Sequence, residues 1–312
     1  MNFEWLNDNI FYGKYRRVSS YFENTELASR GLPEGKELEI LNELRSEVPP
    51  EVFTTAYTNP VNDTPEKQRS NLLKAGELLT QAGWEVKDGV LKHSKTGEVF
   101  AAEFLLANPA FTRVTDSYIQ ALQQLGIQAS ARLVDDTQFQ YRMQNFKFEI
   151  VVGGFRQSES PGNEQREYWS SAAADRAGSR NFIGIKNPAV DKLIDRIIFA
   201  KDRTELVAAS RALDRVLLWN HYCVPQWYMP AERFAYWNRF SHPEPLPNRS
   251  LGFPYIWWYD EAKAAKLAQA GAPPADSEGS TGGRPWLILA ALIALMLAAY
   301  FVARLRRSAR TE

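Results

Sequence analysis

Few residues of this chain are of the types that carry out covalent chemistry. The 312 residues include a single cysteine, Cys223, and three histidines, His93, His221 and His242. No histidine stands at metal-ligand spacing from a cysteine or a carboxylate, and the sequence contains no HExxH, CxxC or GxSxG motif. One cysteine allows no internal disulfide, and Cys223 lies in an apolar run that is typical of a buried thiol. The sequence therefore predicts no catalytic residue, no metal site and no cofactor, and a protein that is not an enzyme.

Residues suited to binding are concentrated between positions 155 and 181. This segment is longer than an ordinary connection, and it follows an apolar strand predicted at 148–155, where α/β folds place their ligand loops. Its arginines can pair bidentately with a carboxylate, its glutamates can accept from an amine, and its rings can cover apolar groups. Alternatively, it is a solvated loop whose charges pair internally and whose tryptophan anchors it. The candidate ligand-binding residues are Arg156, Glu159, Glu164, Arg166, Tyr168, Trp169 and Arg180.

Alternating strands and helices are predicted to hold this loop. Hydrophobic periodicity predicts a hairpin over 89–106 with its turn at 92–97, followed by a β-α-β-α-β succession that indicates an α/β layer. The predicted helices cover 36–47, 64–82, 110–125, 136–145, 187–200 and 202–220, and the predicted strands cover 99–106, 127–134, 148–155, 223–229 and 233–237.

Composition limits the partners. Hydrophobic residues make up 45% and charged residues 24% of the chain, as in globular proteins. There are 37 basic and 37 acidic residues, so no basic excess indicates nucleic acid as a partner. Aromatic residues reach 12%, including nine tryptophans, which either line clefts or fill a core.

The carboxyl-terminal residues predict a membrane anchor. Residues 286–303 carry no charge, and eighteen helical residues span most of a ~30 Å hydrocarbon core. Four arginines follow the span (Arg304, Arg306, Arg307 and Arg310), so the positive-inside rule places the carboxyl terminus in the cytoplasm and the body outside it. The first residues, however, do not form an export signal.

The order of elements and several motifs resemble one protein family. The sequence NPAVDKLID at 187–195, Asp202-Arg203, and Leu213 resemble the carboxyl-terminal lobe of family 5 extracellular solute-binding proteins of ABC importers. The segments FEWLN at 3–7 and ESPGNE at 159–164 resemble the YejA-type branch. The resemblance covers about residues 2 to 262 and does not extend to the tail.

This resemblance implies a periplasmic binding protein type II-like lobe (class C) whose first lobe is missing, plus one transmembrane helix. The chain then looks like the end of a longer protein, which would explain the missing export signal. Relatives often bind the peptide amine through an aspartate in the loop after the glycine-ended strand, and this loop has none. The implied organisation is a lobe at 1–235, a segment returning towards the missing lobe at 236–262, a flexible linker at 263–284, a transmembrane helix at 285–304 and a cytoplasmic tail at 305–312.

The implied function is capture of oligopeptides by lobe closure at the periplasmic face of the inner membrane. The expected partners are an oligopeptide, the ABC permease subunits, the membrane through the carboxyl-terminal helix, and a separate chain if one supplies the other lobe. Three further interpretations compete with this one: a membrane-tethered peptide-sensing ectodomain, a non-functional remnant of a truncated gene, and a membrane-tethered peptidase, against which the missing nucleophile, base and metal constellation counts.

Overall fold

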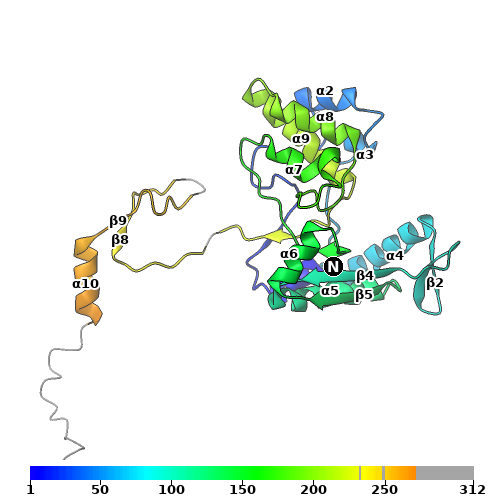
Figure 1. Ribbon diagram of the computed structural model, residues 1–312, viewed down its shortest axis with the longest axis horizontal. Coiled ribbons are helices and arrows are strands. Elements are labelled where there is room, and N and C mark those ends of the chain that lie inside the picture. The colour runs from blue at the N-terminus through cyan, green and yellow to red at the C-terminus, as the bar shows by residue number, and fades with distance from the viewer. Residues whose placement is uncertain (232, 248–249, 272–312) are drawn as a thin grey trace, which may run out of the picture. The chain divides into compact units, whose positions relative to one another are not determined.

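The computed structural model describes residues 1–231, 233–247 and 250–271 of the chain. It divides into two compact units, Met1–Glu232 and Arg233–Glu312, and each is described by itself. Within the first unit, a parallel sheet with its helices and a group of packed helices can be followed in Figure 1.

The sheet of the first unit has three parallel strands in the order β5-β4-β6. Strand β4 (Ala101–Leu106) pairs along its whole length with β5 (Gln128–Leu133), whereas β6 (Ile150–Val151) adds only two residue pairs. Helix α5 (Thr112–Gln123) connects β4 to β5, as parallel pairing requires. Phe104, Ile119 and Ile127 belong to the core formed by these elements.

The predicted strand 148–155 and the predicted hairpin over 89–106 differ in the structure. The segment 148–155 is strand only at β6, because Val152 and the glycines after it leave the ladder and are exposed. Strand β3 (Val90–His93) pairs with β2 (Trp84–Lys87) across Asp88 and Gly89, whose φ angles are 53° and 76°. Two successive positive φ values are those of a type I′ turn, which matches the twist of a hairpin.

The second core lies among helices. Helix α8 (Pro188–Ile198) begins at Asn187, whose side chain accepts from two backbone N–H groups, and α9 (Arg203–Trp219) begins at Asp202, which accepts from Glu205 N. Both helices bury apolar faces with α2 (Gly35–Glu43) and α7 (Glu164–Trp169). Figure 1 shows α2, α8 and α9 side by side.

Two buried polar groups of α9 tie the loop before α2 to this core. The Asp214 carboxylate accepts from Ser20 Oγ at 2.8 Å, from Tyr21 N at 2.7 Å, and from both N and Oγ of Ser29. The next residue, Arg215, is 1% exposed at its side chain and pairs with Glu37 at 2.8 Å. Buried polar groups are retained only when they are satisfied in this way, so this loop is fixed to α9.

The remaining elements of the first unit are short or peripheral. The predicted strand 223–229 is reduced to β7 (Trp227–Tyr228), which pairs with β1 (Arg16–Arg17). The first-unit elements not yet placed are α1 (Phe3–Asn9), α3 (Glu51–Thr54), α4 (Pro65–Gln81), α6 (Asp136–Gln144) and the 3₁₀ turns Pro109–Phe111 and Ser171–Ala173.

The second unit contains a two-stranded antiparallel sheet, β8 (Phe240–Ser241) with β9 (Trp258–Tyr259), and helix α10 (Glu261–Gly271). The predicted strand 233–237 is not formed. Residues 263–271, predicted as linker, are helical, and Asp260 caps that helix by accepting from Lys263 N. No helix of the described residues is long and apolar enough to cross a membrane, and the predicted span 285–304 lies outside them.

Candidate functional site

The candidate site is the loop that leaves the carboxyl end of β6 and leads into α7. Residues 152–163 form no helix or strand, and α7 follows at Glu164–Trp169. Glycines 153 and 154 are exposed, and a Cβ atom built on either would meet no atom within 4 Å. The backbone at the start of this loop is therefore open to close approach by a ligand.

Trp169 anchors the loop to the helical core of the first unit. Its side chain is fully buried, and its ring centroid lies 4.3 Å from that of Phe155 and 5.1 Å from that of Tyr21. A ring enclosed in the core cannot also cover a ligand side chain. In this structure Trp169 matches the alternative interpretation, in which it holds the loop in place.

The indole of Trp169 also fixes the orientation of two side-chain amides. Its Nε1–H, which can only donate, donates to Gln165 Oε1 at 3.0 Å. The Nε2 group of Gln165 then donates to Gln157 Oε1 at 2.7 Å. The Nε2 group of Gln157 remains, enclosed in the loop, and no acceptor among the described residues contacts it.

Tyr168 of α7 contacts Arg156 of this loop and Arg180, which follows α7 in the chain. Its hydroxyl accepts from Arg180 Nη1 at 3.0 Å and donates to the carbonyl of Arg156 at 3.2 Å. The Arg180 guanidinium lies 4.6 Å from the centre of the Tyr168 ring, a cation–π distance. The backbone carbonyl of Arg156, the Tyr168 hydroxyl and the Arg180 guanidinium are thus brought together, with Tyr168 buried and both arginines exposed.

The other charged candidates have partners within the protein. Glu164 accepts from Gly162 N at 2.9 Å and from Gln165, so it stabilises the turn into α7. Arg166 pairs with Asp195 of α8 at 2.8 Å. The carbonyl of Glu159 accepts from Arg203 of α9. The structure therefore does not bring Glu164 or Arg166 to the Arg156–Tyr168–Arg180 group.

Sequence reasoning missed Gln157 and Gln165. Glutamines carry no charge and form no motif. The two are related only by their separation of eight positions across the turn into α7. Their role depends on the buried indole, which a sequence pattern does not reveal.

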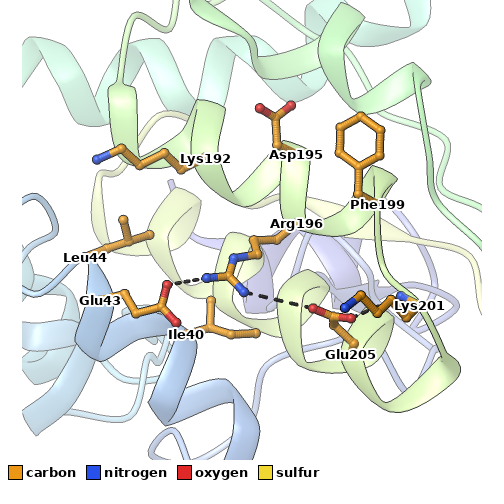
Figure 2. Close-up of a pocket in the computed structure, with 9 residues that line it drawn as sticks. All are labelled: Ile40, Glu43, Leu44, Lys192, Asp195, Arg196, Phe199, Lys201 and Glu205. Carbon is orange, nitrogen blue, oxygen red and sulfur yellow. Dashed lines mark hydrogen bonds and ion pairs between the residues drawn. The ribbon is translucent and has the colours of Figure 1, made fainter.

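A hollow lies away from this loop, among α2, α8 and α9. It has a volume of about 480 Å³, and Figure 2 shows Arg196 between Glu43 and Glu205 within it. Arg196 forms ion pairs with both carboxylates. Lys192 and Asp195 of the hollow also pair within the protein, with Glu47 and Arg166, so most of its charged side chains already have partners. Among the described residues no cluster of His, Cys, Asp and Glu could hold a metal ion.

Comparison with known proteins identifies the family. Residues 1–176 match the model of bacterial extracellular solute-binding proteins, family 5 Middle. This match covers more than half of the chain, so the chain belongs to that family.

The similar proteins include binding proteins of bacteria. The chain is 48% identical over 261 residues to the probable peptide-binding protein YejA of Agrobacterium fabrum, covering 84% of this chain and 42% of that protein. It is 39% identical over 270 residues to the uncharacterized protein YejA of Escherichia coli, covering 86% of this chain and 44% of that protein. The chain thus spans less than half the length of these relatives.

The fold is that of periplasmic oligopeptide-binding proteins. The oligopeptide-binding protein AppA of Bacillus subtilis, solved with a nonapeptide, superposes with a TM-score of 0.59 at 17% identity, covering 83% of this chain and 45% of AppA. The oligopeptide binding protein of Thermus thermophilus superposes with a TM-score of 0.53 at 14% identity, covering 73% of this chain and 36% of that protein. At these identities the likeness concerns the fold alone.

Proposed function

We propose that this chain contributes one lobe of the peptide-binding component of an ABC importer. The observation that carries the proposal is the 48% identity, over 84% of this chain, to a probable peptide-binding protein. The loop after β6 supports it, because a ligand loop at the carboxyl end of a parallel sheet is the usual arrangement in α/β folds.

The proposed mechanism is capture without bond breaking. Peptide would bind against the β6 loop and be enclosed when a second lobe closes over it, a hinge motion typical of periplasmic binding proteins. The part of the relatives that this chain does not span is the source of that second lobe. Delivery to permease subunits completes the proposal.

The location is proposed from the sequence. The uncharged run at 286–303 and the four arginines after it favour a single span at 285–304 with a cytoplasmic tail at 305–312. The described residues would then lie at the periplasmic face of the inner membrane.

Calorimetry with tetra-alanine tests the proposal. The full chain, in detergent micelles, is titrated alone and after mixing with the part of the Agrobacterium fabrum relative that the alignment leaves uncovered. We expect weak binding by the chain alone, since half of the cleft is missing, and binding roughly tenfold or more tighter in the mixture, about 1.4 kcal/mol or more. Absence of peptide binding in both samples would contradict the proposed function.

A further inference from the structure

We infer that a cavity lined by α4, α5 and β1 of the first unit receives an apolar polypeptide segment from the part of the longer relatives that this chain does not span. The inference rests on the proposed function, in which that part supplies the second lobe, and it adds the surface on which the two parts meet. The backbone of the segment would offer a carbonyl oxygen to Arg17 and an N–H to Asn59.

The cavity has a volume of about 350 Å³ and shares no lining residue with the loop after β6. Helix α4 contributes Leu72 and Ala75 to its wall, and α5, which is labelled with α4 in Figure 1, contributes Tyr118 and Leu122. Strand β1 contributes Arg17. Two apolar helix surfaces and one charged side chain thus surround a single space.

The apolar surfaces of both helices at this cavity are incompletely covered. Helix α4 is 17 residues long, and none of its residues is buried. On α5, Tyr118, Ala121 and Leu122 are only half-buried, whereas Val114 and Ile119 on the same helix are buried. Helices in proteins are stabilised mainly by packing of an apolar face against a neighbour. The uncovered surfaces therefore indicate that a neighbouring element belongs in the cavity.

Arg17 gives the cavity a donor that lacks an acceptor. Its Nη1 donates to the carbonyl of Pro60 at 2.6 Å, and no carboxylate of the described residues forms an ion pair with it. Its Nε–H is enclosed and has no acceptor in the described part of the chain. Guanidinium groups only donate hydrogen bonds, so an occupant that brings an acceptor oxygen would satisfy this residue.

Asn59 gives the same wall an acceptor that lacks a donor. Its Nδ2 group donates to the carbonyl of Val18 at 2.7 Å, and its Oδ1 is enclosed without a donor among the described residues. Buried polar groups of complete folds are nearly always hydrogen-bonded. A simple anion supplies acceptors alone, whereas a polypeptide backbone supplies a carbonyl and an N–H together. The pair of Arg17 and Asn59 therefore favours a polypeptide occupant.

The longer relatives identify the source of that segment. The relative from Agrobacterium fabrum aligns over 261 residues, which cover only 42% of it, so more than half of that protein lies outside the alignment. Met1 and Asn2 line the cavity. A segment that precedes the aligned residues in a longer relative would therefore reach this space within a few residues.

Protection of the single cysteine tests the inference, because Cys223 lines the cavity and is half-buried. The full chain, in detergent micelles, is treated with methyl methanethiosulfonate, alone and with rising concentrations of the uncovered part of the Agrobacterium fabrum relative, whose folding is checked by circular dichroism. Mass spectrometry of the peptide that contains Cys223 gives the modification rate, and its dependence on partner concentration gives a Kd. The intact relative is the specificity control, because its own aligned part already occupies the segment.

Two variants alter the cavity, and each has a matched control. Arg17→Gln removes the guanidinium, and its control is Arg16→Gln, because Arg16 is exposed, does not line the cavity and points to the opposite face of β1. Ala121→Trp fills the cavity from α5, and its control is Gln120→Trp, because Gln120 is exposed on the same helix and does not line the cavity.

We expect the uncovered part to slow modification of Cys223 roughly tenfold or more, and we expect Arg17→Gln and Ala121→Trp, but not their controls, to raise the Kd roughly tenfold. Absence of protection, equal protection by the intact relative, or equal Kd values for the variants and their controls would overturn the inference. Protection by tetra-alanine without the partner would overturn it too, because the cavity would then belong to the ligand. The proposed function fails separately, when tetra-alanine binds in neither sample of the calorimetric test.

Discussion

The indole Nε1–H of Trp169 donates a hydrogen bond to Oε1 of Gln165 at 3.0 Å in the interior of the first unit. Both side chains are fully buried, and both lie on α7 four residues apart. Through this bond a core residue determines which end of an amide faces the candidate ligand loop. Packing in the core and the orientation of a side chain of the candidate loop are thus coupled in one short helix.

Trp169→Phe should test this coupling. Phenylalanine keeps much of the ring packing but removes the donor, so we expect a loss of about 2 kcal/mol in the free energy of unfolding. Urea unfolding of the full chain measures it. Trp237→Phe is the control, because Trp237 is 66% exposed, and its change should stay within about 0.5 kcal/mol. Equal losses in the two variants would contradict a structural role for the Trp169–Gln165 bond.

The buried pair of Arg215 and Glu37 should show strong coupling in a double-mutant cycle. Arg215→Met alone leaves the Glu37 carboxylate buried beside an apolar group, and we expect a loss of about 3–5 kcal/mol. Arg215→Met/Glu37→Met should lose much less than the sum of the two single variants, because no charge is then left unpaired. Urea unfolding of the four proteins gives the coupling energy, and additive losses would argue against the pair.

Removal of the Asp214 carboxylate should destabilise the chain more than removal of any one of its donors. Asp214→Ala leaves four hydrogen-bond donors of the loop before α2 without their acceptor, so we expect a loss of about 3 kcal/mol or more. Ser20→Ala removes one hydroxyl donor and should cost about 1 kcal/mol. Thermal unfolding followed by circular dichroism separates these values, and a smaller effect for Asp214→Ala than for Ser20→Ala would refute this account.

Tyr21 should make the chain sensitive to alkaline pH. Burial, together with the neighbouring Cys223 and Asp214, raises the pKa of Tyr21 well above its ordinary value. Above about pH 10 the unfolded chain loses this proton while the folded chain keeps it, so stability falls as pH rises, by about 1.4 kcal/mol per pH unit per group. Below that pH the two states bind the same number of protons at Tyr21.

Spectrophotometric titration of the phenols at rising pH checks this prediction. Tyr21→Phe should remove a late component of the titration and should make the stability less steep above pH 10. Tyr255→Phe, which changes a phenol that is 93% exposed, should leave both unchanged. If the two variants titrate identically, Tyr21 does not have the raised pKa described here.

The elements of the first unit were largely predictable, because they depend on local patterns. The capping residues Asn187 and Asp202 begin α8 and α9 as their sequences indicate, and the apolar run of β4 forms the central strand. Asp88-Gly89 was overlooked as a hairpin turn, although an Asp-Gly pair between two apolar segments is a strong local signal. The length of β6 was overestimated because an apolar run does not show where a ladder ends.

By itself the sequence determined the α/β class, the family and the position of the candidate loop, since periodicity, caps and motifs are properties of neighbouring residues. Only the tertiary structure decided what each candidate side chain does. It enclosed Trp169, paired Arg166 with Asp195 of a distant helix, and left Arg156 and Arg180 beside Tyr168. Whether a charge meets a partner depends on packing between elements far apart in the chain, and that information is not carried by local spacing.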